Sequence, residues 1–176
     1  MSTSPDLSRK PDRCEYFEFY HGYVEKVPPG KLWELLESQS SELKSFFSKV
    51  TEDQAMVLHS PYTWTAKQVL GHMIDAERIF GDRIHRFAAG DPQEQPGMDQ
   101  DPYVTNQDFQ RTPLKDLVAE WSHCRAANHL LIARTKEEAW NNRGIASGHL
   151  ISVRALIWIL VGHVAHHMDI LRHRLT

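Results

Sequence analysis

The sequence predicts an all-α protein, a four-helix bundle with a short extra helix near its N-terminus. Four long stretches repeat apolar residues at three- and four-residue steps, turn or capping residues separate them, and no stretch alternates as a strand does. With 176 residues, of which 41% are apolar, the chain can bury a core without disulfides. We therefore expect a single domain over residues 15–176, preceded by a flexible segment over residues 1–14.

The first part of the domain is rich in aromatic residues. Five of them lie between Tyr16 and Tyr23, and such a stretch must pack on the rest of the chain. We predict a short helix here, ended by the Pro-Pro-Gly run at residues 28–30. Between Leu32 and Val50 the apolar side chains recur with helical spacing, which predicts the first long amphipathic helix.

The second long helix has a clear start signal. Thr65 and Gln68 have the spacing of a capping box, in which each side chain bonds the backbone N–H of the other residue. The helix should run to about Ala89, before Gly90 and Pro92. The segment that follows, up to Arg111, is long for a compact domain and predicts either a lid or a crossover connection.

The third and fourth long helices complete the bundle. Thr112 is expected to cap the third helix, with Pro113 as its first residue, since proline has no N–H to leave unpaired there. A loop over residues 141–148 precedes the last helix, for which Ser152 is the expected cap. We expect no β-strand in the chain.

Composition excludes several classes of function. The 20 basic and 23 acidic residues show no basic stripe, so we expect no binding of nucleic acid. No apolar run is long enough to cross a bilayer, and the polar N-terminus has no signal-peptide pattern, so we expect no membrane association. Cys14 and Cys124 form no CxxC motif, and a reducing cytoplasm is the expected location.

Three histidines are expected to point into the bundle. His163 and His167 are one helical turn apart on the apolar stripe of the last helix, and His72 is on the inward side of the second. Buried imidazoles need partners, which could be backbone groups or water, but three of them on two helices favour a shared divalent metal ion. Nitrogen ligands suit zinc or nickel, and without a fourth protein ligand the site would stay open to water or substrate. His166 is the alternative for the third ligand.

Charged residues near His72 have two interpretations. Arg78, Arg83 and Arg86 could bind the carboxylates of a small thiol, or they could form a solvated helix face or pair with charges on a neighbouring helix. Asp75 and Glu77 could support the metal site, although ion pairs with these arginines are the simpler expectation. The remaining histidines are expected at the surface or in loops: His21, His59, His85, His123, His129, His149 and His173.

Two segments resemble a known family. The run from Trp64 to Arg78 and the run Gly162–His167 are similar to motifs of the DinB-like superfamily, also called the DinB/YfiT-like metalloenzymes, and the likeness extends from about Tyr16 to the end. The resemblance implies a four-helix bundle, often dimeric, in which His72, His163 and His167 are the metal ligands. Members include transferases and isomerases that use bacillithiol or mycothiol, and metal-dependent hydrolases.

These observations lead to two hypotheses about function. In the first, the chain is a metal-dependent enzyme that transfers a low-molecular-weight thiol to a small electrophilic substrate, or hydrolyses that substrate. In the second, it is a non-catalytic metal-binding or structural bundle. An open metal position that faces a pocket would favour the enzyme. The aromatic N-terminal region and the resemblance also predict a homodimer.

Overall fold

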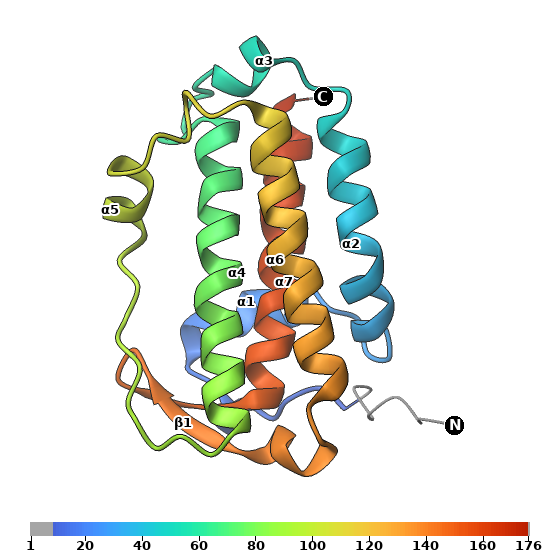
Figure 1. Ribbon diagram of the computed structural model, residues 1–176, viewed down its shortest axis with the longest axis vertical. Coiled ribbons are helices and arrows are strands. Elements are labelled where there is room, and N and C mark those ends of the chain that lie inside the picture. Colours follow the sequence, from blue (N-terminus) through green and yellow to red (C-terminus); the bar gives the residue numbers. More distant parts are fainter. Residues whose placement is uncertain (1–8, 176) are drawn as a thin grey trace.

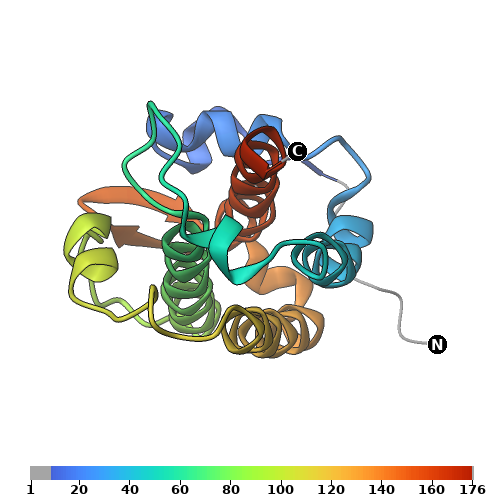
Figure 2. The ribbon, with the colours of Figure 1, turned by 90° about the horizontal axis from the view of Figure 1, so that it is seen from above.

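The computed structural model describes residues 9–175 and confirms an all-α four-helix bundle (Figures 1 and 2). The long helices repeat apolar residues on one side, and they bury that side against each other. The four long helices are α2 (Leu32–Phe47), α4 (Ala66–Ala88), α6 (Leu114–Arg134) and α7 (Val153–Leu175). Three short helices accompany them: α1 (His21–Glu25), α3 (Glu52–Met56) and α5 (Gln100–Thr105).

The helices do not alternate in direction along the chain. In Figure 1, α2 and α7 run upward, whereas α4 and α6 both run downward and pack against each other as parallel neighbours. The connection between α4 and α6 therefore returns along the outside of α4, carrying α5 on its way. The length of the segment before Arg111 predicted either a lid or a crossover connection, and the structure shows the crossover.

The N-terminal arm lies on the outer side of α7 (Figure 2). It confirms the predicted short extra helix, here α1, which follows two 3₁₀ turns at Arg13–Glu15 and Glu18–Tyr20. Residues 1–8 of the segment expected to be flexible lie outside the described residues. Residues 9–14 are held beside α7 through the contacts of Glu15.

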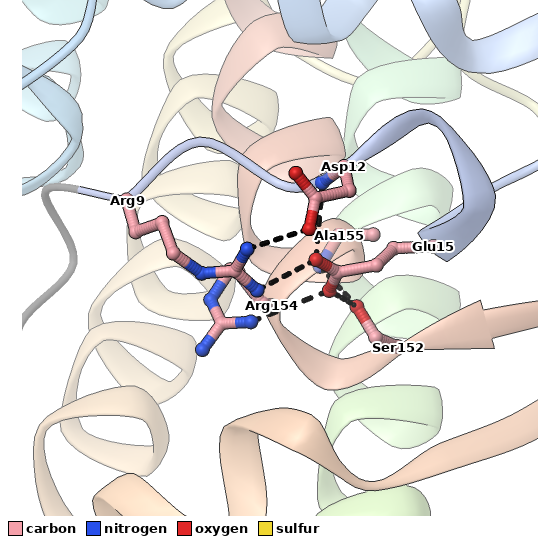
Figure 3. A network of polar contacts seen from close by, with 6 residues as sticks. All are labelled: Arg9, Asp12, Glu15, Ser152, Arg154 and Ala155. Atoms are coloured by element: carbon pink, nitrogen blue, oxygen red, sulfur yellow. Dashed lines mark hydrogen bonds and ion pairs between the residues drawn. The ribbon is translucent and has the colours of Figure 1, made fainter.

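Glu15 joins the arm to the start of α7 (Figure 3). The Ser152 hydroxyl donates to Glu15 at 2.6 Å and accepts the N–H of Ala155 at 3.0 Å, so Ser152 caps α7 as predicted. Arg9 and Arg154 approach the same carboxylate, at 2.8 and 3.4 Å. The cap of the last helix and the attachment of the arm are thus one network.

A short β-hairpin precedes α7, and here the sequence-based expectation of a structure without strands was wrong. Strands β1 (Arg143–Ala146) and β2 (His149–Ser152) pair antiparallel across a two-residue turn. Ser147 and Gly148 have φ angles of 55° and 76°, the left-handed values that a tight hairpin turn requires. Ile145 and Leu150 on either side of Ser-Gly were the signal for it.

The cap of α4 agrees with the sequence. Gln68 N–H bonds the Thr65 hydroxyl at 3.3 Å, and Thr65 N–H bonds the Gln68 side chain at 3.0 Å, which confirms the capping box. The helix ends at Ala88, and Gly90 follows with a φ of 78°. A left-handed glycine just beyond a helix is a common way to end it.

The start of α6 differs by one residue from the prediction. Its N-cap is Pro113 rather than Thr112, and Leu114 is the first helical residue. The Leu114 N–H donates to a carboxylate oxygen of Glu52 at 2.7 Å, while the Thr112 hydroxyl donates to the backbone instead. A side chain that is distant in sequence caps this helix, so the local capping rule did not find it.

The core is divided into two apolar halves. In one, α7 from Val153 to Val161 packs with Phe80 of α4 and with Trp140, which precedes the hairpin; in the other, Met73 of α4 packs with Trp121 of α6. Polar side chains lie where each long helix passes from one half to the other: Gln39, Glu77, Arg125, Asn128 and His163. We call these residues the polar belt.

Within residues 9–175, no helix is both long and apolar enough to span a membrane.

Candidate metal centre

His163 of the polar belt meets two further histidines, His72 and His167. The Nε2 atoms of His72 and His163 are 3.0 Å apart, and those of His163 and His167 are 3.1 Å apart. The three residues are 5%, 5% and 9% exposed, respectively. Together they form the only potential metal-binding group of three or more residues found among the residues that the structure describes.

The positions of these residues on α4 and α7 direct their side chains into the bundle. Every residue of α7 from Val153 to Val164 is buried, so position 163 faces the interior whatever residue occupies it. One turn later His167 lies on the same side of α7. His72 follows the capped first turns of α4, which pack against α7.

All three imidazoles are held in their neutral form. Burial, with a smaller contribution from the nearby His166, lowers the pKa of His72 to about 4. Burial also lowers the pKa values of His163 and His167 well below the ordinary value of 6.5, and the other imidazoles act in the same direction. Arg125 adds a positive charge near His163. Metal binding needs such neutral rings, because each offers a lone pair.

Hydrogen bonding alone does not account for this cluster. A ring nitrogen carries either one proton or one lone pair, yet Nε2 of His163 has two other ring nitrogens within 3.1 Å. Nitrogens bound tetrahedrally to one zinc ion would be about 3.3 Å apart, close to these distances. The cluster therefore fits a divalent ion. The buried Nδ1 atoms of His72 and His167 lack partners within the described chain, so packing orients these rings.

The structure separates His166 from the cluster, although it is the neighbour of His167. Its ring is half-buried and lies edge-on to Tyr23, with the ring centroids 5.2 Å apart. The alternative third position therefore goes to His167 on geometric grounds. The seven histidines expected at the surface or in loops are indeed not buried.

Glu77 does not pair with an arginine of its own helix. It pairs with Arg125 of α6, and both side chains are almost completely buried, at 1% and 2% exposed. Arg125 also donates to Gln39 of α2 at 2.8 Å, and Gln39 donates to the Val161 carbonyl of α7 at 2.9 Å. Asn128 donates to the second Glu77 oxygen at 2.8 Å. The prediction that Glu77 pairs with an arginine of α4 was wrong, because its partner, Arg125, lies across the bundle on α6.

Asp75 has only a weak version of the expected ion pair. Its closest approach to Arg78 is 3.9 Å, and the Gln107 amide donates to it at 3.2 Å. Burial raises the pKa of Asp75, whereas Gln107 and Arg78 oppose that rise. Asp75 thus belongs to the contact between α4 and the crossover segment, outside the histidine cluster.

The three arginines of α4 have different surroundings. Arg78 pairs with Glu120 at 2.5 Å and Arg86 pairs with Asp82 at 2.9 Å, both as partly exposed ion pairs. Arg83 is buried and lines the pocket that His72 and His163 also line. Only this one of the three is therefore placed to contact a ligand there.

A pocket of about 300 Å³ opens beside the histidines. The sequence did not single out its other walls, although the aromatic stretch before residue 24 was a signal for one of them. Gly162 permits this wall, because a Cβ at that position would lie 1.9 Å from the Tyr23 carbonyl oxygen. Burial raises the pKa of Tyr23, as does Tyr20, so its phenol stays protonated. The lining residues are Phe19, Tyr20, Tyr23, His72, Ala76, Ile79, Phe80, Arg83, Met98, Asp99, Gln100, Ser147 and His163.

Several solved structures resemble this fold, including the two that follow. The first is YfiT from Bacillus subtilis, described as a probable metal-dependent hydrolase with an unusual four-helix bundle topology. It has a TM-score of 0.72 and 16% identity over 96% of this chain and 95% of its own. The second is a mycothiol-dependent maleylpyruvate isomerase, with a TM-score of 0.67 and 13% identity over 86% of this chain and 62% of its own. At these identities the likeness concerns the fold.

The sequence itself gives the assignment to a family. No curated protein matches the chain significantly. A family model described as the DinB superfamily matches residues 35–171, which include all four long helices almost completely and all three clustered histidines. The chain therefore belongs to the DinB superfamily.

Proposed function

We propose that this chain is a metal-dependent enzyme in which His72, His163 and His167 hold a zinc or nickel ion. The reaction we propose is attack on a small electrophilic substrate, either by a low-molecular-weight thiol that is transferred to it or by water that hydrolyses it. One observation carries the proposal: the three Nε2 atoms converge, two of the three histidines, His72 and His163, line a pocket, and no fourth residue completes the group among the described residues. An open position of this kind is typical of catalytic metal sites.

A divalent ion bound there would lower the pKa of a thiol or water and polarise the electrophile. The chain supplies the surroundings for that chemistry. Three neutral imidazole ligands leave the ion its full double positive charge, whereas carboxylate ligands would reduce that charge. The Tyr23 phenol is protonated and lines the pocket near His163, so it can donate a hydrogen bond to a substrate.

The names of the similar structures support both nucleophiles. YfiT is described as a probable metal-dependent hydrolase and the isomerase as mycothiol-dependent, so water and a thiol each have a precedent on this fold. Both cysteines of the chain are free, which suits the reducing cytoplasm that we propose as its location.

The competing function is a non-catalytic bundle in which an ion only joins α4 to α7. A structural zinc site has four protein ligands, whereas this cluster offers three and borders a pocket. That difference favours the enzyme.

Metal analysis of untagged protein, purified without chelators, tests the ligand set. We expect close to one zinc or nickel ion per chain, and loss of the ion in His72→Ala, His163→Ala and His167→Ala. The matched control is His166→Ala, which changes the neighbouring histidine of α7 and should retain the ion. Wild-type protein that takes up neither metal, or ligand variants with unchanged metal content, would refute the assignment.

Activity assays then separate the two nucleophiles. The metal-loaded protein is given a panel of small thiols with halogenated or epoxide acceptors, and separately a panel of esters and amides in water. Turnover should disappear in His72→Ala and return with metal in the wild type only. Cobalt-substituted protein whose absorption no thiol changes would exclude thiol transfer at the metal. Turnover that survives metal removal would refute the proposed role of the metal in either reaction.

A further inference from the structure

We propose that Arg83 is an anion-binding residue at the end of the pocket remote from the histidines, and that the ligand is a small carboxylate. This inference rests on the proposed function, because it specifies the substrate or thiol of the same pocket. The ligand would place its reacting group beside the histidines and its carboxylate on Arg83.

The contacts of Arg83 leave part of its guanidinium free. Nη2 donates to the Pro96 carbonyl at 2.7 Å and to the Ser147 hydroxyl at 3.3 Å. Both acceptors are neutral. Nε and Nη1 have no partner within residues 9–175, although the side chain is only 4% exposed and lines the pocket. A nearly buried permanent cation therefore has unused donors beside a cavity.

Two of the three other buried arginines in the described chain lie beside a carboxylate. Arg125 pairs with Glu77, and Arg154 lies 3.4 Å from Glu15. Arg174 lacks a carboxylate, but it stacks on the Tyr62 ring and donates to a backbone carbonyl. Arg83 differs from all three because it lines the pocket of the histidine cluster. Burying a cation without a counterion is costly, and an anionic ligand would offset that cost.

The hairpin and the crossover segment hold Arg83 in place. Ser147 is in the tight turn, and the Gln95 backbone joins the crossover segment to β1 through bonds of 2.8 and 3.0 Å. Pro96 follows Gln95 directly, so both acceptors of Nη2 are anchored. A guanidinium whose one end is fixed presents its remaining edge in the fork geometry that matches a carboxylate.

The spacing of the two polar ends sets the shape of the ligand. His72 and Arg83 are eleven residues apart and share one face of α4, which separates their Cα atoms by about 16 Å along the axis. Ile79 and Phe80 line the pocket between them, and its volume of about 300 Å³ is small for a ligand site. The pocket therefore suits a short molecule with an apolar middle and a carboxylate at one end.

Asp99 also lines this pocket, and its charge could compete with a ligand. Its carboxylate accepts the N–H of Asp101 at 3.3 Å, so it caps α5. Within the described chain no carboxylate lies within 4.0 Å of Arg83. Asp99 is exposed, and its carboxylate lies farther from Arg83 than an ion pair allows. The Arg83 guanidinium is therefore available to a ligand.

The test measures binding of phenylacetate, phenylpropanoate and phenylbutanoate, each against its uncharged amide, by titration calorimetry. The protein is used both metal-loaded and after chelation, because a carboxylate could also bind the ion. We expect at least one acid to bind about tenfold or more tightly than its amide, in both forms of the protein. Arg83→Gln should remove this preference, and Arg86→Gln, on the same helix, should retain it.

The outcome is independent of the metal assignment. A preference that survives chelation and requires Arg83 supports the inference even if the proposed reaction fails. Two results with the wild type would overturn it: equal affinity for acid and amide, or no binding of any acid at millimolar concentration. A preference for the acid that persists in Arg83→Gln, or that vanishes on chelation, would also overturn it. Thermal unfolding of Arg83→Gln checks its fold, and Arg83→Lys, which keeps the charge, should recover part of the preference if the variant is destabilised.

Discussion

Gly162 is the residue at which the backbones of α1 and α7 meet. A Cβ there would lie 1.9 Å from the carbonyl oxygen of Tyr23, and neither helix can yield at backbone atoms as a flexible side chain can. The same contact places the Tyr23 ring 5.3 Å from the ring of His163. One missing side chain thus permits an aromatic wall beside the proposed metal centre.

We predict that Gly162→Ala lowers the free energy of unfolding by roughly 1–3 kcal/mol or more, because the added methyl group forces α1 away from α7. Urea denaturation measures this change. Gly22→Ala is the matched control: nothing lies within 4 Å of a Cβ at this position of α1, so the variant should be as stable as the wild type or slightly more stable. Equal stability of the two variants would show that the close contact has no energetic effect.

At the scale of elements, Glu15 attaches the N-terminal arm to α7. Burial raises the pKa of Glu15, but the hydrogen bonds from Ser152 and from the Asp12 backbone, with Arg154 and Arg9, outweigh it and lower the pKa below 4.5. The carboxylate form is therefore favoured in the folded protein. Because the arm also forms a pocket wall, this attachment bears on the candidate site.

We predict that Glu15→Gln destabilises the protein by about 1–3 kcal/mol at neutral pH. A group with a lowered native pKa stabilises the fold fully above its unfolded pKa and loses that contribution as pH falls through the native value. The difference between wild type and Glu15→Gln should thus be constant above pH 4.5 and shrink below it. Thermal unfolding across this range measures the difference.

Glu18→Gln is the control for this experiment. Glu18 forms an ion pair with Arg13, and the two side chains are 70% and 51% exposed, respectively. Such an exposed ion pair should contribute little to the free energy of unfolding. A loss in Glu18→Gln equal to that in Glu15→Gln, or a difference for Glu15→Gln that does not depend on pH, would contradict the role of Glu15.

At the scale of the whole molecule, the polar belt connects all four long helices. Arg125 of α6 donates to Glu77 of α4 and to Gln39 of α2, and Gln39 donates to the backbone of α7. Arg125 also contributes to the low pKa of His163. The belt therefore joins the four long helices at the level of the histidine cluster.

We predict that Arg125→Met costs roughly 3–5 kcal/mol, because it leaves the Glu77 carboxylate buried without a counterion. The double variant Arg125→Met with Glu77→Gln should be more stable than the single variant, since no isolated charge remains. Chemical denaturation of both, with the exposed Arg78→Met as control, tests this. A double variant less stable than Arg125→Met would contradict it.

The homodimer remains a prediction. The N-terminal arm exposes Phe17 and Phe19, at 42% and 67%, and the Phe17 ring stacks on His149 of the hairpin. Light scattering at micromolar concentration should give twice the chain mass of 20.3 kDa, and Phe19→Ser should lower that value. Leu130→Ser, which removes an equally exposed apolar side chain from α6, should not. A single-chain mass for the wild type would exclude the dimer.

Local patterns in the sequence determined the four long helices and the three inward histidines. Helical periodicity, the capping box at Thr65 and the N-cap at Ser152 depend on groups within four residues of each other, so they can be read without knowing the fold. The spacing of His163 and His167 is of the same kind. These features were predicted because their physical causes are local.

The tertiary structure alone decided which distant groups meet. Glu52 caps α6, Arg125 pairs with Glu77 across 48 positions of the chain, and Arg83 rather than Arg78 or Arg86 reaches the pocket. The parallel course of α4 and α6 and the hairpin that closes one end of the pocket likewise have no sufficient local signal. Each depends on how helices pack and which buried charges can be satisfied, and that is a property of the whole bundle.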